Sequence, residues 1–187
     1  MKLKKNIFSN ILFLGIIVLL ILPVTRKPIQ VFIHKGLAKI SPSIVTKENQ
    51  EQLTDYNWIL ESHNGVTYNF NDAKEEVVFI NFWATWCPPC IAEMESINNL
   101  YKDYGGKVIF LLVTNEDKAI VSSFKAKNNY EFKYYRSLSQ IPELFEASSI
   151  PKTYVLDKAG NIVINKTGAA NWNSALVRSL LDEKMKD

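Results

Sequence analysis

The sequence of 187 residues contains only two cysteines and two histidines. Two cysteines cannot form the framework of a disulfide-rich secreted fold. A zinc site needs about four ligands, and His34 and His63 have no fixed sequence relation to the cysteines. The charge is nearly balanced, with 22 Lys and Arg against 19 Asp and Glu, and the charged residues are scattered. We therefore expect no resident metal, no cofactor and no nucleic-acid partner.

The amino-terminal end differs in character from the rest of the chain. Three lysines precede the apolar run Ile7–Val24, and Arg26 and Lys27 follow it. A charged start followed by an apolar run is typical of a signal peptide or a signal anchor. The run is near the lower limit of about 17–25 residues for a spanning helix. No small-x-small cleavage site follows it, so we expect an uncleaved anchor rather than a removed signal peptide or a buried core helix.

The remaining sequence divides into a tether and one domain. Hydrophobic residues make up 47% of the chain and aromatic residues 12%, which is enough for a packed core. We expect residues 1–25 to form a cytoplasmic start and a transmembrane signal anchor. Residues 26–54 mix apolar residues with serine, proline and charges, and we interpret them as a tether. Residues 55–187 form the predicted globular domain.

Two short apolar runs, Val77–Trp83 and Lys107–Val113, have the composition of strands buried on both faces. Between them, apolar residues recur at helical spacing over residues 91–104, and two glycines follow as a stop signal. A strand, a helix and a strand of these lengths predict two parallel strands joined by a right-handed crossover.

The flanking sequence adds two hairpins and three helices. Asn64-Gly65 and Lys158-Ala159-Gly160 each separate strand-like runs and predict hairpins. Helices are predicted over residues 117–127, from Ser139 as a cap to about Ala147, and over residues 171–187. The predicted fold class is therefore α/β, a central mixed sheet flanked by helices on both faces, with an amino-terminal hairpin extension.

The two cysteines, Cys87 and Cys90, are separated by Pro88 and Pro89 in the stretch FINFWATWCPPC. Cys87 falls where the predicted strand ends and the helix begins, and free backbone N–H groups at that position lower a thiol pKa. Cys90, one turn into the helix, is expected to be more buried. Disulfide exchange needs an exposed attacking sulfur and a shielded resolving sulfur. A redox dithiol is thus favoured over a structural staple, a zinc site or a copper(I) site.

This stretch, the strand–helix–strand unit around it and the segment IPKTYVLDKAGNIV resemble the thioredoxin fold. More narrowly, they resemble the membrane-anchored TlpA/ResA/CcmG-like thiol–disulfide oxidoreductases, which act outside the cytoplasmic membrane. The resemblance covers roughly Asp55 to Leu181, and the Trp-Cys-x-x-Cys block is its most specific part. It implies a thioredoxin-like fold for the predicted domain.

The resemblance also implies roles for individual residues. Cys87 would form a mixed disulfide with the substrate, and Cys90 would resolve it, leaving a Cys87–Cys90 redox disulfide. Ile150-Pro151 matches the cis-proline element that faces the cysteines and pairs its backbone with an extended substrate. Trp86, next to Cys87, is expected at the apolar rim that touches substrate.

The two prolines between the cysteines are also expected beside the substrate, and they remove hydrogen-bond donors. Pro88 and Pro89 lack an N–H group, so two donors of the first helical turn are missing. Fewer donors stabilise the Cys87 thiolate less. We therefore expect the dithiol to be more reducing than one without prolines.

Glu93 is the predicted proton acceptor. It lies three residues after Cys90 and matches the acid of the ResA- and CcmG-like relatives. Cytoplasmic thioredoxins commonly place an Asp six residues before the first cysteine, where this chain has Asn81, which cannot take a proton. A partly buried carboxylate beside a nascent thiolate titrates at raised pH, which suits a proton acceptor. The alternative is a solvated helix glutamate, such as Glu95 on the outer side.

These observations predict a single-pass protein of the cytoplasmic (inner) membrane whose catalytic domain faces the periplasm or cell exterior. Its predicted activity is the reduction of disulfides in exported proteins, with apocytochrome c before haem attachment as one candidate class. The predicted partners are these substrates, a membrane thiol electron donor and the lipid bilayer. The alternatives are a disulfide oxidase, isomerase or peroxidase with the same cysteines, and a non-enzymatic copper-delivery or assembly factor.

Overall fold

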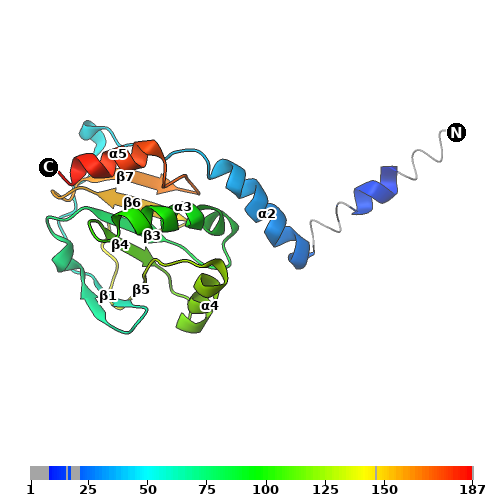
Figure 1. Cartoon of the computed structure of the whole chain (residues 1–187), viewed down its shortest axis with the longest axis horizontal. Helices are drawn as coiled ribbons and strands as arrows, with labels where there is room; N and C mark the ends of the chain where they lie inside the picture. Colours follow the sequence, from blue (N-terminus) through cyan, green and yellow to red (C-terminus); the bar gives the residue numbers. More distant parts are fainter. Residues whose placement is uncertain (1–8, 16, 18–21, 146, 187) are drawn as a thin grey trace.

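The computed structural model describes residues 9–15, 17, 22–145 and 147–186 (Figure 1). The named helices are α2 (Pro23–Leu37), α3 (Pro88–Tyr104), α4 (Lys118–Asn128) and α5 (Ala175–Lys184), with 3-10 helices η1 (Lys47–Asn49) and η2 (Phe70–Ala73). The strands are β1 (Ile59–Ser62), β2 (Thr67–Asn69), β3 (Val78–Phe82), β4 (Ile109–Val113), β5 (Tyr134–Ser137), β6 (Lys152–Leu156) and β7 (Ile162–Thr167).

The seven strands form one mixed sheet in the order β2-β1-β5-β4-β3-β6-β7. β3, β4 and β5 are parallel, whereas β1, β2, β6 and β7 pair antiparallel with their neighbours. The predicted parallel pair on either side of a helix is confirmed as β3–α3–β4, and both predicted hairpins are present as β1–β2 and β6–β7. β3 therefore lies inside the sheet, hydrogen-bonded on both edges, and α3 begins at its carboxyl end.

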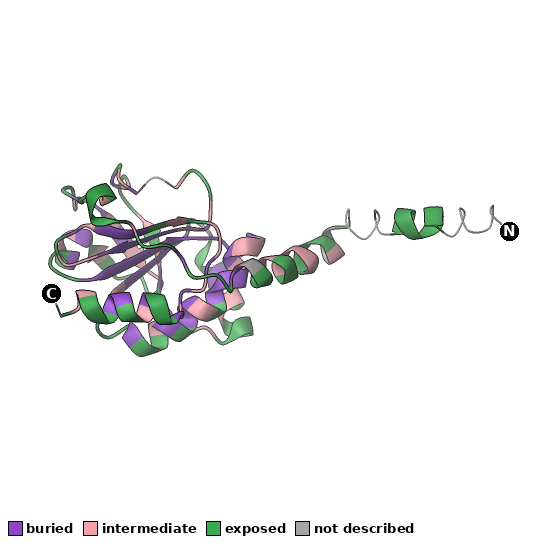
Figure 2. Cartoon of the chain, turned by 90° about the horizontal axis from the view of Figure 1, so that it is seen from above, coloured by how far each residue is buried: buried purple, intermediate pink, exposed green. Residues whose placement is uncertain are grey.

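The first face of the sheet packs against α3 and α5. Every residue of β3 is buried, as its continuous apolar run predicts, and successive side chains enter opposite cores. Phe79 points into the first core, where Met94 of α3 and Leu181 of α5 are buried with it. Figure 2 shows the resulting pattern, with buried strands and helices that are buried on one side only.

The second face is covered by η2 and by an irregular segment after β5. Trp58, Phe70 and Phe145 pack there in tilted and edge-on contacts. The prediction of a helix from Ser139 is wrong, because the described residues from 139 to 147 contain turns, bends and irregular backbone but no helix. The Ser139 hydroxyl accepts a hydrogen bond from the Ile59 N–H (2.9 Å) instead of capping a helix.

The predicted tether, residues 26–54, contains most of α2, which begins at Pro23 within the predicted anchor, and an irregular segment with η1 beside the domain. Backbone hydrogen bonds join this segment to the domain: Asn171 N–H to Ile40 O (2.8 Å), Val45 N–H to Val163 O (2.9 Å) and Leu53 N–H to Gly160 O (2.9 Å). Of the predicted apolar run Ile7–Val24, residues 7, 8, 16 and 18–21 lie outside the described residues. Within the part of the chain that the structure describes, no helix has both the length and the apolar character to cross a membrane.

Candidate functional site

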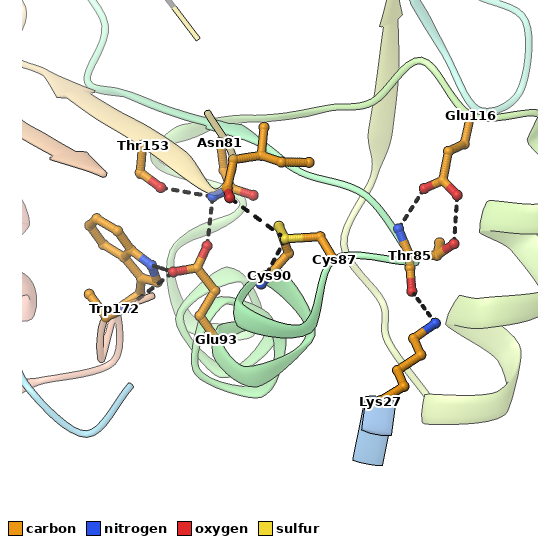
Figure 3. The surroundings of a disulfide bond; sticks show 11 residues. Lys27, Asn81, Thr85, Cys87, Cys90, Glu93, Glu116, Thr153 and Trp172 are labelled. Atoms are coloured by element: carbon orange, nitrogen blue, oxygen red, sulfur yellow. Dashed lines mark hydrogen bonds between the residues drawn. A yellow bond between two sulfur atoms is a disulfide. The ribbon is translucent and has the colours of Figure 1, made fainter. Parts of the chain in front are cut away.

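The candidate site lies where β3 leads into α3. Cys87 is the N-cap of α3, and Pro88 and Pro89 occupy its first two positions, where a missing N–H costs no helical hydrogen bond. The first N–H group able to reach the cap is that of Cys90, which donates to Cys87 Sγ (3.3 Å; Figure 3). The backbone therefore offers the Cys87 sulfur one donor from the first turn instead of the usual choice of two.

Cys87 and Cys90 form a disulfide. The expectation that Cys87 is the exposed sulfur is wrong for this oxidised form, because Cys87 is 3% exposed and Cys90 is 0% exposed. The carbonyl oxygen of Ile150 lies 3.7 Å from Cys87 Sγ and contributes to covering it. The difference in accessibility between the two sulfurs is thus small while they are bonded to each other.

The loop before β6 faces the cysteines across the end of the sheet. The Ile150–Pro151 peptide bond is cis, as the resemblance implies. Because β6 pairs antiparallel with β3, the residues before β6 lie beside the end of β3 from which Cys87 follows. Ile150 is half-buried, and its carbonyl oxygen points to the disulfide.

An apolar groove opens beside the disulfide. Trp86 is 62% exposed, whereas Trp83 is buried in the core next to Phe124 and Phe132. The groove has a volume of about 350 Å³, and its lining includes Phe82, Trp83, Trp86, Ile141, Ala147 and Ile150. Trp86, the predicted rim residue, and Ile150, from the loop before β6, therefore line the same groove.

Glu93 is fully buried below the disulfide, on the face of α3 that meets the sheet. Its carboxylate accepts three hydrogen bonds, from Asn81 Nδ2 (2.9 Å), Trp172 Nε1 (2.8 Å) and the Ala170 N–H (3.1 Å). Asn81 Nδ2 also donates to Thr153 Oγ1 (2.7 Å), and Asn81 Oδ1 is buried without a hydrogen-bond partner. Figure 3 shows these side chains gathered on one side of the disulfide. The alternative reading of Glu93 as a solvated glutamate is therefore wrong.

Burial raises the pKa of Glu93 from 4.5 to about 7. The hydrogen bonds from Trp172, Asn81 and Ala170 act in the opposite direction, and so does the positive charge of Lys166. Desolvation outweighs these contributions because no part of the side chain reaches water. A carboxyl group that titrates near neutral pH can both take up and release a proton under physiological conditions.

The raised pKa makes ionisation of Glu93 a cost to the folded state. Between pH 4.5 and about 7 the folded chain binds more protons at this site than the unfolded chain does. The free energy of unfolding therefore falls as pH rises through this range, by about 3 kcal/mol from this group alone. His63 has the opposite effect on the pH dependence of stability. Burial lowers the pKa of its imidazole, so its contribution to the free energy of unfolding rises with pH. The Glu93 contribution is best isolated by comparing variants.

We expect Trp172→Phe to destabilise the fold increasingly as pH rises above about 7, where the wild-type carboxyl group is ionised and that of the variant still holds its proton. The substitution removes a donor that lowers the Glu93 pKa, so the carboxyl group becomes harder to ionise. The difference in the free energy of unfolding between wild type and variant should grow with pH by about 2 kcal/mol, which is the value of a hydrogen bond to a charged group. Urea unfolding at a series of pH values measures it.

Trp58→Phe is the matched control for this prediction. It removes another buried indole donor, which binds the Ser137 hydroxyl (2.7 Å) instead of a titrating group. Its destabilisation should be constant with pH. Parallel stability curves for Trp172→Phe and the wild type would show that the indole does not hold the Glu93 carboxylate.

Sequence reasoning missed several residues of the site. Trp172 is 79 positions from Glu93, and Thr153 reaches the cluster only through Asn81. A second cluster holds the loop before Cys87, where the Glu116 carboxylate accepts from both the backbone N–H (2.5 Å) and the hydroxyl (2.6 Å) of Thr85. No local pattern points to these contacts, because each joins elements that are distant in sequence.

The side chains that could ligate a metal ion are spread over the described part of the chain. Among the residues that the structure describes, no three His, Cys, Asp or Glu side chains are grouped to hold a metal ion. The two sulfurs of the site are bonded to each other. The chemistry that this arrangement supports is reversible cleavage of the disulfide, with a buried carboxyl group of pKa about 7 close by.

The fold and the site together define a thioredoxin-like protein with a cysteine pair, here a disulfide, at the start of a helix. A profile of the Redoxin family matches residues 48–181. The chain belongs to the redoxin family.

Individual relatives agree with this assignment. The thiol-disulfide oxidoreductase ResA of Bacillus subtilis is 30% identical over 115 residues, which are 60% of this chain and 64% of ResA. The thioredoxin-like protein YneN of the same organism is 33% identical over 60% of this chain and 67% of YneN. The chain thus matches less than two thirds of the length of ResA.

A solved structure supports the fold independently. The crystal structure of a secreted thiol-disulfide isomerase from Corynebacterium glutamicum aligns with a TM-score of 0.54 at 23% identity. The alignment covers 76% of this chain and 89% of the other. At this identity the likeness concerns the fold alone, a mixed sheet flanked by helices.

Proposed function

We propose that this chain is a thiol–disulfide oxidoreductase that exchanges disulfides through Cys87 and Cys90. The observation that carries the proposal is a disulfide at the start of α3 with a buried carboxyl group of pKa about 7 one helical turn beyond it. The relationship to ResA supports it. We propose further that the protein works as a reductant of exported proteins, including apocytochrome c as one candidate class.

The proposed reaction begins from the reduced dithiol. The Cys87 thiolate attacks one sulfur of a substrate disulfide, and the other substrate sulfur leaves as a thiolate. Cys90 then gives up its proton, with Glu93 as acceptor, and attacks Cys87 Sγ. This step forms the Cys87–Cys90 disulfide and releases the second substrate sulfur, so two electrons pass to the substrate. A membrane thiol donor returns the two electrons, and Glu93 returns its proton.

The proposed substrate site is the apolar groove beside the disulfide. Trp86 supplies an exposed apolar surface next to Cys87, and the backbone of Ile150 is free of strand pairing at the position beside the disulfide. An extended peptide that pairs with the backbone before Pro151 has its own disulfide close to Cys87. Pro88 and Pro89 line the proposed approach on the helix side.

We also propose that the protein is anchored in the cytoplasmic membrane by residues 1–25, with the domain of residues 55–187 outside. The charged start and the apolar run support the anchor. An alternative use of the same cysteines as an oxidase or isomerase differs in reduction potential. A copper-delivery factor would instead bind stoichiometric copper(I) in the presence of a competing chelator.

The reduction potential tests the proposed direction of electron flow. We expect a value at or below about −220 mV for the Cys87–Cys90 pair, measured by equilibration in thiol buffers of known potential. The physical reason is the missing donor at Pro89, which leaves the Cys87 thiolate with a single N–H in the first turn. A value near −120 mV would contradict a reductant and support an oxidase.

Pro89→Ala sharpens this test. An N-cap side chain accepts from the second or third helical N–H, so alanine at position 89 restores a donor to Cys87 Sγ. We expect the potential to rise by about 30 mV, which corresponds to about 1.4 kcal/mol in favour of the dithiol. Pro88→Ala, whose N–H is at the first position, is the matched control and should leave the potential nearly unchanged.

A further inference from the structure

The outer side of α2 carries an exposed apolar stripe. Phe32 is 79% exposed, and Ile33 and Leu22 are exposed as well. Half-buried Ile29 lies on the same side of the helix, because Phe32 and Ile33 follow it at the helical spacings of 3 and 4 residues, and Leu22 directly precedes the helix. Soluble proteins do not usually leave such a stripe uncovered on a helix of 15 residues.

The other side of α2 is attached to the catalytic end of the domain. α2 packs against α3, and Lys27 Nζ donates to the carbonyl oxygen of Thr85 (3.2 Å), two residues before Cys87 (Figure 3). After the helix, the Ile40 carbonyl oxygen accepts from the Asn171 N–H (2.8 Å). The helix is therefore attached to the domain near both of its ends. One side of α2 faces the loop that carries the disulfide, and its apolar stripe faces away from that loop.

The distribution of charge differs between this segment and the domain. Eight of the 22 Lys and Arg residues precede Glu48, and none of the 19 Asp and Glu residues does; three of the eight belong to the predicted cytoplasmic start, which leaves five on the side of α2 (Arg26, Lys27, Lys35, Lys39 and Lys47). Residues 48–187 therefore carry 14 basic and 19 acidic side chains. An anionic lipid surface attracts the first part and repels the second, so it favours one orientation of the molecule.

We propose that the outer side of α2 rests on an anionic lipid surface and holds the Cys87–Cys90 disulfide about one helix diameter above it. A basic helix with an exposed apolar stripe is the type that lies in a membrane interface. The helix diameter, about 10–12 Å, sets the separation. The proposal deepens the proposed function and rests on its membrane anchor.

The local backbone permits this arrangement. Leu22 has an extended conformation (φ −64°, ψ 123°) just before Pro23, the first residue of α2. The chain therefore does not continue as one straight helix from the apolar run Ile7–Val24 into α2, and α2 is free to take a direction along the surface. The partners that reach the disulfide most readily are then thiols and disulfides that protein chains hold close to the bilayer.

Tryptophan fluorescence provides a direct test. Of the four tryptophans, all of which the structure describes, Trp58, Trp83 and Trp172 are buried and Trp86 is exposed beside Cys87. The full chain is placed in nanodiscs of phosphatidylcholine and phosphatidylglycerol that carry nitroxide-labelled headgroups. We expect the labelled lipids to quench the emission of Trp86, and we expect Trp86→Phe to abolish this quenching.

Variants of α2 separate orientation from anchoring. Phe32→Ser with Ile33→Ser, or Lys35→Glu, should reduce quenching to the level of Trp86→Phe, while the chain still co-purifies with the nanodiscs. Lys186→Glu, with the same charge change near the other end of the molecule, should leave quenching intact. Exchange with a soluble disulfide substrate should be unchanged in all three variants, and this assay tests the proposed function separately.

Two results would overturn the orientation. One is unquenched Trp86 emission in a chain that co-purifies with nanodiscs, and the other is quenching that the α2 variants do not alter. A chain that does not associate with nanodiscs at all would overturn the anchor and the orientation together. In that case exchange with the soluble substrate still decides whether the dithiol has the proposed activity.

Discussion

Replacing Cys87 by serine is expected to reduce disulfide exchange to the background rate of the thiol reductant alone. A serine hydroxyl stays protonated at neutral pH and cannot form a mixed disulfide. The only other sulfur of a cysteine in the chain belongs to Cys90, which is fully buried on the sheet side of α3. Reduction of insulin by dithiothreitol, followed by turbidity, measures the loss.

Cys90→Ser is expected to fail at the second step instead of the first. This variant keeps the attacking thiol of Cys87 but lacks the sulfur that resolves the mixed disulfide. One substrate molecule should therefore remain bound to each chain, which intact-mass measurement detects and dithiothreitol reverses. If Cys87→Ser trapped substrate and Cys90→Ser did not, the assigned roles of the two sulfurs would be exchanged.

The local part of this arrangement could be predicted because local patterns determine it. A continuous apolar run gives a strand buried on both faces, and helical spacing after Cys87 gives α3. The position of the cysteines at the junction follows from these two facts. The hairpin at Asn64-Gly65 follows from turn chemistry, since Gly65 has a φ of +83° that other residues rarely adopt.

The parts that could not be predicted depend on contacts between distant segments. The burial of Glu93 depends on Trp172 and Asn81 from two other elements, and its sequence neighbour Glu95 remains exposed. The helix predicted at Ser139 is absent because the hydroxyl that would cap it binds the backbone of β1. Propensity is a weak guide wherever tertiary contacts use the same donors and acceptors.

Glu93→Gln is expected to slow the resolving step by about a hundredfold at neutral pH, within the range for loss of general acid–base catalysis. Glutamine cannot accept the proton of the Cys90 thiol, and no other carboxylate takes part in the described cluster around Glu93. Rapid mixing of the reduced protein with a peptide disulfide separates formation of the mixed disulfide from its resolution. Only the second phase should slow.

The pH profile distinguishes proton transfer from a structural role for Glu93. In the wild type, the rate of resolution should rise with an inflection near pH 7, because only the ionised carboxylate accepts a proton. Glu93→Gln should lose this inflection, and Glu95→Gln, an exposed glutamate of the same helix, should keep both the rate and the inflection. If Glu93→Gln lowered the rate equally at every pH and kept the inflection, another group would be the acceptor. The buried carboxylate would then serve to fix Asn81 and Trp172, the two side chains whose hydrogen bonds it accepts.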